Sequence, residues 1–180
     1  YAIAKIAGIK MCQYYSDNYK VNYKSLMPPN LYGPNDNFDL YESHFYPALI
    51  KKIHNSKIKK KKTLEVWGSG KAKRELMYVD DFAAAAVYFM RRGFKEPFLN
   101  IGNGKEFSIK WFAKFIMKQL GVNLKIVYDK SRPDGMPNKC LDISLAKKYG
   151  WKPNPDYVKG FQKTYDHFLN YQSNQKSKKV

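Results

Sequence analysis

A tyrosine and a lysine stand four positions apart at the start of the sequence, as Tyr1 and Lys5. The apolar residues that follow predict a helix from Tyr1 to about Tyr19, and on a helix this spacing places both side chains on one face, about one turn apart. A fixed ammonium favours the phenolate form of a neighbouring phenol, so the pair could donate a proton to a developing oxyanion. Because the chain has 15 tyrosines and many lysines, such a pair also arises by chance, and its meaning depends on the rest of the chain.

The histidines and cysteines suggest one further acid–base candidate and no metal site. His44 is placed where a loop leads into a predicted helix, although a lone histidine is more often structural. The other histidines, His54 and His167, are far away in sequence, and neither cysteine has a metal-ligand spacing. We interpret Cys12 as a small core residue. Two cysteines make no disulfide framework, which favours a reducing cytoplasm.

Two glycine pairs are candidates for a phosphate-binding loop, but each lacks a glycine that this loop needs. Residues 102–104, Gly-Asn-Gly, follow a predicted strand and precede a helix, yet Phe107 stands where the dinucleotide fingerprint needs its third glycine. Residues 68–70, Gly-Ser-Gly, have Lys73 at that position. We therefore predict turns at both places and find no dinucleotide fingerprint in this sequence.

The elements that would position these residues alternate between helix and strand. The predicted helices are 1–19, 44–55 with Ser43 as its cap, 82–92 capped by Asp80 or Asp81, 108–120 capped by Ser108 and ended by Gly121, 144–149, and 156–171. The predicted strands are 22–27, 64–67, 74–79, 98–101, 124–128 and 139–142, with loops at 30–38 and 131–138. This alternation predicts an α/β fold. The first helix is apolar nearly all round, so we expect it to be buried on two sides, by a sheet and by a partner subunit.

The net charge of +18 suggests a polyanionic partner. Nucleic acid is the weaker choice, because 29 of the basic residues are lysine and only four are arginine, and the lysines are scattered over every segment. We interpret the dense block Lys57–Lys62 as a solvated loop. A small polyanionic substrate would also suit this charge, and no apolar run is long enough for a membrane span. A basic nucleic-acid-binding module remains as an alternative.

The chain also carries a series of short motifs in a fixed order. They are Tyr1-Ala2-Ile3-Ala4-Lys5-Ile6-Ala7-Gly8, Asn30-Leu31-Tyr32-Gly33-Pro34, Asp36-Asn37-Phe38, Ser43-His44, Pro47-Ala48-Leu49, Trp67-Gly68-Ser69-Gly70, Arg74-Glu75, Tyr78-Val79-Asp80-Asp81 and Pro133-Asp134-Gly135. In this order they resemble the GDP-L-fucose synthases, a family of the extended short-chain dehydrogenase/reductase superfamily. The resemblance runs from Tyr1 to about Trp151.

The resemblance implies an NADPH-dependent enzyme that epimerises carbons 3 and 5 of GDP-4-keto-6-deoxy-D-mannose and then reduces carbon 4. In this family the residue at Tyr1 donates a proton to the 4-oxygen, and the residue at Lys5 assists it and holds the nicotinamide ribose. The residue at His44 reprotonates the sugar ring. The family's partner base is a cysteine upstream of the tyrosine, a position that Cys12 does not match.

The resemblance also assigns the binding residues. The cofactor-binding set is Tyr1, Lys5, Pro28, Pro29, Asn30, Leu31 and His44, and the substrate-binding set is Lys52, Trp67, Arg74 and Asp134. Pro29 replaces the usual threonine, so a hydroxyl contact is in question there. Lys52 and Arg74 could neutralise a diphosphate and Trp67 could offer a flat apolar surface. Each also has a plain alternative: Trp67 as core filler, Arg74 in a surface ion pair, and Asp134 as a turn former.

We expect the chain to be the C-terminal half of such an enzyme, inactive alone and homodimeric through helix Tyr1–Tyr19. Residues 1–32 would end an NADP-binding Rossmann domain, to which residues 79–102 return. Residues 33–78 and 103–172 would form a smaller substrate domain, followed by a frayed tail at 173–180. Another nucleotide-sugar epimerase or dehydratase of the same superfamily is the nearer alternative.

Overall fold

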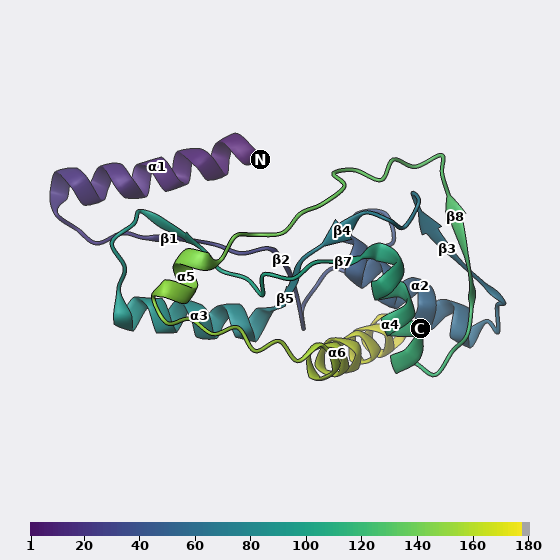
Figure 1. The fold of residues 1–180 in the computed structure, drawn as a ribbon. Coiled ribbons are helices and arrows are strands. Elements are labelled where there is room, and N and C mark those ends of the chain that lie inside the picture. The colour runs from purple at the N-terminus through teal and green to yellow at the C-terminus, as the bar shows by residue number, and fades with distance from the viewer. Residues whose placement is uncertain (178–180) are drawn as a thin grey trace.

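The computed structural model describes residues 1–177, in which helices and strands alternate (Figure 1). The elements are α1 (Ala2–Tyr19), β1 (Ser25–Met27), β2 (Asn30–Tyr32), α2 (Phe45–Ile58), β3 (Thr63–Trp67), β4 (Lys73–Arg74), β5 (Leu76–Tyr78), α3 (Val79–Arg92), β6 (Phe98–Asn100), β7 (Phe107–Ser108), α4 (Ile109–Gln119), β8 (Lys125–Asp129), α5 (Ser144–Lys148) and α6 (Tyr157–Ser177). The predicted α/β class is confirmed.

Among residues 1–177 the strands form four pairs, three of them parallel. β1 pairs with β6, β2 with β5, and β3 with β8, all in the parallel sense, whereas the short pair β4–β7 is antiparallel. Parallel pairs need long crossover connections, and helices fill these connections here. In Figure 1 β1 leads into β2, which lies beside β5.

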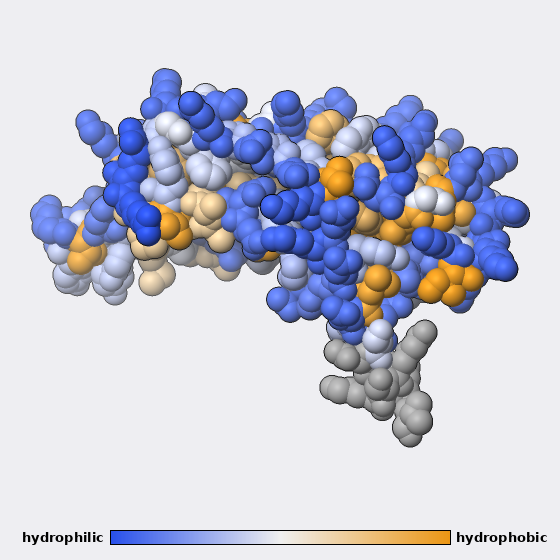
Figure 2. All heavy atoms as spheres, turned by 90° about the horizontal axis from the view of Figure 1, so that it is seen from below, coloured by the Kyte–Doolittle hydropathy of each residue, from blue (hydrophilic) through white to orange (hydrophobic). Residues whose placement is uncertain are grey.

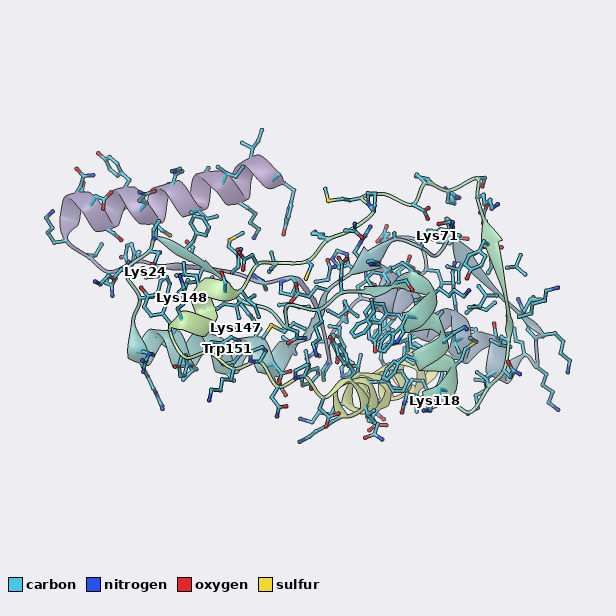
Figure 3. The ribbon with its side chains drawn as sticks, viewed as in Figure 1. Lys24, Lys71, Lys118, Lys147, Lys148 and Trp151 are labelled. Carbon is cyan, nitrogen blue, oxygen red and sulfur yellow. The ribbon has the colours of Figure 1, made fainter. Side chains whose placement is uncertain are left out.

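Two separate apolar cores support these elements. The larger core lies among α2, α4, α6 and β3, and its fully buried members include Ile50, Phe112 and Phe168. The smaller core lies among α3, β5, β6 and α5, around Phe89 and Leu99. Trp151, labelled in Figure 3 next to α5, packs on α3 with its ring centroid 5.8 Å from that of Tyr88. Strand β5 contributes to both cores, with Leu76 and Tyr78 in the larger and Met77 in the smaller.

Helix α4 follows its sequence signals closely. The Ser108 hydroxyl accepts a hydrogen bond from the Trp111 amide at 3.1 Å, which is the predicted N-cap. Gly121 has a φ of 64°, the left-handed conformation that ends helices. Its buried residues Phe112, Ala113, Ile116 and Met117 recur at helical spacing.

Four predictions on element boundaries were wrong. The predicted loop 30–38 begins with strand β2, and the predicted strand 139–142 is not a strand. The predicted strand 74–79 is divided between β4 and β5, and strand β7 was not predicted at all. These strands are two or three residues long, and distant partners specify them, so the local sequence gives no period to detect.

The helix caps and the C-terminal end also need correction. His44, and not Ser43, is the N-cap residue of α2, and Tyr78 is the N-cap residue of α3, so Asp80 and Asp81 lie inside its first turn. α6 continues to Ser177, so the tail predicted from residue 173 is helical as far as the structure describes it. Residues 178–180 lie outside the described part.

Helix α1 is the clearest departure from expectation. No α1 residue is buried, and Ile3 and Ile6 are 82% and 58% exposed. In Figure 1 the helix lies apart from the rest of the molecule. The prediction that a sheet covers one side of α1 is wrong for this chain, and Cys12 is half-buried instead of lying in a core.

Candidate functional site

Tyr1 and Lys5 lie together on one face of α1, as their spacing predicts. The Lys5 Nζ atom is 5.4 Å from the centroid of the Tyr1 ring, and the Lys5 amide donates to the Tyr1 carbonyl at 3.1 Å. The Tyr1 side chain is 97% exposed. A phenol and an ammonium are therefore available to a ligand at this end of the helix.

His44 is held by the turn that precedes α2. The Asp39 carboxylate accepts hydrogen bonds from the amides of Tyr41 and Glu42, at 2.7 and 3.0 Å, and the Ser43 hydroxyl donates to the Asp39 carbonyl. This closed turn places His44 at the exposed start of the helix. No hydrogen bond or ring contact within residues 1–177 joins His44 to Tyr1 or Lys5, so the structure does not bring the three catalytic candidates into contact.

The proposed cofactor residues Pro28, Pro29, Asn30 and Leu31 lie where β1 passes into β2. All four are half-buried. Hydrogen bonds hold this segment on both sides. The Met27 carbonyl accepts from the Ile101 amide at 2.9 Å, and the Asn30 side-chain amide donates to the Glu75 carbonyl at 3.4 Å. The backbone of this segment is thus held in place at the carboxyl end of a parallel strand pair, where α/β proteins bind ligands.

Trp67 is the centre of the substrate candidates. The Lys52 Nζ atom is 4.3 Å from the centroid of its ring, and the Arg132 guanidinium carbon is 5.0 Å away. The Tyr41 ring lies 6.3 Å from it, and the indole N–H donates to the Glu65 carboxylate at 3.3 Å. With 37% of its surface exposed, Trp67 is an accessible platform and not core filler.

Lys52 is partly removed from water at this place. Burial lowers the pKa of its ammonium, while the carboxylates of Glu65 and Asp129 act in the opposite direction. The loss of hydration is thus larger than the compensation from the two acids. An additional anion near Lys52 would find a cation that is incompletely neutralised.

Asp134 and Arg74 hold a loop together instead of pointing freely at solvent. The Ser69 amide and hydroxyl each donate to the Asp134 carboxylate at 2.6 Å, and these bonds, together with Lys71 (labelled in Figure 3) and Arg74, keep the pKa of Asp134 below its usual range. The Arg74 guanidinium donates to the carbonyls of Lys73 and Met136, at 2.7 and 2.6 Å. Asp134 thus acts as a turn former, which was its plain alternative. Arg74 donates to backbone carbonyls and forms no ion pair among residues 1–177.

Sequence reasoning missed the part that Glu75 plays. This residue is fully buried, and its carboxylate accepts from the amides of Asn103, Gly104 and Leu141, at 2.5, 2.7 and 2.8 Å. A Cβ atom on Gly102 would lie only 2.3 Å from this carboxylate, so the glycine is needed there. The amides of the Gly-Asn-Gly turn thus bind an internal carboxylate, which agrees with its interpretation as a turn. The sequence pointed to Glu75 only as part of the motif Arg74-Glu75.

The fold and the Tyr1–Lys5 pair define a class, the extended short-chain dehydrogenase/reductases. The chain belongs to the NAD dependent epimerase/dehydratase family, whose sequence pattern matches residues 1–102. The resemblance deduced from the motifs is also confirmed. A GDP-L-fucose synthase of Sinorhizobium fredii is 44% identical over 94% of this chain and 54% of its own length, and one of Escherichia coli is 40% identical over 96% and 56%.

Solved structures agree with this placement. The NADP-bound crystal structure of a GDP-L-fucose synthetase from Naegleria fowleri superimposes with a TM-score of 0.84 at 26% identity, covering 96% of this chain and 56% of that one. The chain spans about half the length of the curated relatives it matches. No helix within residues 1–177 is both long and apolar enough to cross a membrane.

Proposed function

We propose that this chain supplies the substrate-binding and proton-donating part of a GDP-4-keto-6-deoxy-D-mannose 3,5-epimerase-4-reductase, which forms GDP-L-fucose with NADPH. The observation that carries the proposal is the contact of Lys52 with Trp67, next to the loop built by Arg74 and Asp134. These four are the positions at which the motifs match the family's substrate contacts. Relatives named GDP-L-fucose synthase, at 40% identity and above, support it.

In this proposal Tyr1 donates the proton that the carbon-4 oxygen takes up, because an acid is needed where the oxyanion develops. Lys5 favours the phenolate that Tyr1 becomes. His44 returns a proton to the sugar ring during epimerisation. NADPH, when bound, supplies the hydride for carbon 4. Residues 28–31 are suited to contact the cofactor, because they form a half-buried segment whose backbone is held in place at the carboxyl end of a strand pair.

We further propose a division into two units, with residues 1–32 and 79–102 in the nucleotide-binding unit and residues 33–78 and 103–172 in the substrate unit. The two separate cores support it. Helix α5 lies in residues 103–172 of the substrate unit but packs on the smaller core. In this division α5 would therefore contact the nucleotide-binding unit. A homodimer through α1 and a cytoplasmic location, which the two free cysteines favour, complete the proposal.

The 180-residue chain alone should not turn over NADPH, because its sequence contains no dinucleotide fingerprint. The test is a chimera in which the N-terminal portion of the Escherichia coli relative precedes Tyr1. We expect this chimera to oxidise NADPH with the GDP-keto-sugar and the Tyr1→Phe variant to lose at least about 100-fold in kcat.

A Tyr14→Phe variant, which changes an exposed tyrosine of the same helix, is the matched control and should keep full activity. His44→Gln should slow the exchange of solvent deuterium into carbons 3 and 5. NADPH oxidation by the 180-residue chain alone, or an active Tyr1→Phe chimera, would contradict the proposal.

A further inference from the structure

A groove runs between helix α4 and strand β8. It has a volume of about 490 Å³, and apolar side chains, among them Met117 and Ile126, line it. Three lysines of α4 also line it at intervals of four residues, and we call Lys110, Lys114 and Lys118 the lysine row. Lys118 is labelled in Figure 3. Because a helix rises about 1.5 Å per residue, neighbours in this row are about 6 Å apart along the helix axis.

The lysine row has no acidic partner within residues 1–177. None of its three ammonium groups forms an ion pair or a hydrogen bond there, and all three side chains are exposed. Neither α4 nor the segment 120–128 contains an aspartate or a glutamate. Like charges four positions apart on a helix repel each other, so an anionic ligand would relieve this repulsion. The groove therefore combines an apolar surface with unpaired positive charge.

Strand β8 has a free edge beside this groove. Among residues 1–177 it pairs with β3 alone, and Figure 1 shows both strands at the end of the molecule away from α1. The Lys125 amide donates to the Lys62 carbonyl at 3.0 Å, and the Asp129 carbonyl accepts from the amide that follows β3 at 2.9 Å. Alternate residues of a parallel strand direct their backbone groups to opposite sides. The amides and carbonyls of Ile126 and Tyr128 therefore point away from β3 and are open to another strand.

The lysine row runs alongside this free edge. At one end the Lys110 amide donates to the Gly70 carbonyl at 3.0 Å, and a Cβ atom on Gly70 would collide with the Tyr128 ring. At the other end the Val122 amide donates to the Met117 carbonyl at 3.0 Å. Every second residue of a strand lies about 6.7 Å from the last, close to the spacing of the lysine row. Acidic residues at alternate positions of an added strand would therefore match the lysines one for one.

We propose that the free edge of β8 is a docking site for an extended acidic segment of a partner protein, which adds to this two-stranded sheet as a further strand. The segment pairs its backbone with Ile126 and Tyr128 and directs its carboxylates at the lysine row. Val127, 47% exposed, is an apolar neighbour for residues on the other face of the segment. A second copy of this chain is the poorer occupant, because its net charge of +18 opposes close approach of two such edges.

The test is the fluorescence anisotropy of a labelled peptide of about seven alternating glutamates and valines, titrated with the 180-residue chain at about 50 mM salt. We expect saturable binding. Lys114→Glu, in the middle of the lysine row, should weaken it at least about fivefold, because the new carboxylate repels those of the peptide. Lys152→Glu makes the same change of charge at an exposed residue between α5 and α6, and this matched control should weaken binding less than about twofold. A peptide of alternating lysines and valines should not bind.

Methylation of the peptide's backbone nitrogens tests the pairing with β8 separately. Methylating one alternating set of residues should abolish binding and methylating the other set should not, because only one set donates to the edge. The amides of Ile126 and Tyr128 should also exchange hydrogen more slowly in the complex. No saturable binding, equal effects of both methylated sets, equal effects of both charge reversals, or unprotected amides would overturn the site. Self-association of the chain that slows exchange at these two amides would overturn it too, and would place a second copy at this edge. No nucleotide enters these measurements, so the proposed function is tested independently.

Discussion

Two residues that we propose as substrate contacts also have a structural role in this chain. Asp134 and Arg74 occupy substrate positions of the family, yet in this chain they also bind Ser69 and the carbonyls of the loop. Glu75 has a structural role alone, because it is fully buried and accepts hydrogen bonds from three backbone amides. Substitution at Asp134 or Arg74 should therefore alter the loop as well as any ligand contact.

The Ser69–Asp134 pair should make folding stability depend on pH in acid. The pKa of Asp134 in the folded chain is below its ordinary value of 3.8, because Ser69 donates to the carboxylate. A depressed folded pKa contributes stability that is complete above the unfolded value and is lost as the pH falls through the folded value. The urea midpoint of the unchanged chain should therefore exceed that of Asp134→Asn at about pH 6, and the difference should shrink below about pH 4.

Asp166→Asn, which changes an exposed aspartate of α6, is the control, and its difference from the unchanged chain should not shrink in this way. A difference for Asp134→Asn that stayed constant from pH 6 to the acid limit would show that the charge of Asp134 does not stabilise the loop.

The sequence identified residues by type and spacing but not by contact. Tyr1 and Lys5 could be paired from local geometry alone, because a helix fixes neighbours four positions apart. Arg132 and Trp67 are 65 positions apart in sequence, and only the pairing of β3 with β8 brings their segments together. Glu75 could not be recognised, because its partners come from two distant loops.

Whole elements show the same limit. Helix α4 was predicted with both of its ends, because a serine cap and a left-handed glycine are local signals. Strands β2 and β7 depend on distant partners and were missed, and β4 was predicted only as the start of one longer strand. Helix α1 was predicted correctly in extent, but its environment was not, because its apolar residues are spread around the helix and indicate no single face.

The exposed apolar residues of α1 should support the homodimer that we propose. Ile3 and Ile6 are 82% and 58% exposed, more than isolated surface residues would explain, since Met11 and Tyr14 on the same helix are exposed too. We expect the protein to sediment as a dimer and the Ile3→Ser, Ile6→Ser double variant to sediment as a monomer. Ile58→Ser, a change of a 63% exposed isoleucine at the end of α2, should leave the dimer intact.

A protein that sediments as a monomer before any substitution, or a double variant that remains dimeric, would count against an interface through α1. Dimerisation that Ile58→Ser abolishes would place the interface at α2 instead.

At the scale of the whole molecule, the lysines behind the charge of +18 occur in every segment of the sequence, with one dense block at Lys57–Lys62. Only two ion pairs occur among the residues that the structure describes, Lys73–Glu106 and Lys163–Asp80, and both lysines are half-exposed. Figure 2 shows hydrophilic side chains over most of the face seen from below, with apolar side chains between them. A polynucleotide needs a continuous basic track along its phosphates, whereas a diphosphate needs only two or three converging cations.

Polynucleotide binding therefore provides the sharpest test between the enzyme and the basic binding module. Because scattered lysines neutralise few consecutive phosphates, we expect a fluorescent 20-nucleotide DNA or RNA to show no change in anisotropy with micromolar protein at about 150 mM salt. Weak binding at about 20 mM salt should disappear steeply as salt is added, whereas GDP binding through Lys52 and Trp67 should weaken far less. Tight polynucleotide binding at the higher salt, unaffected by Lys52→Gln, would instead favour the binding module, because the charge would then act as one surface and not through a local site.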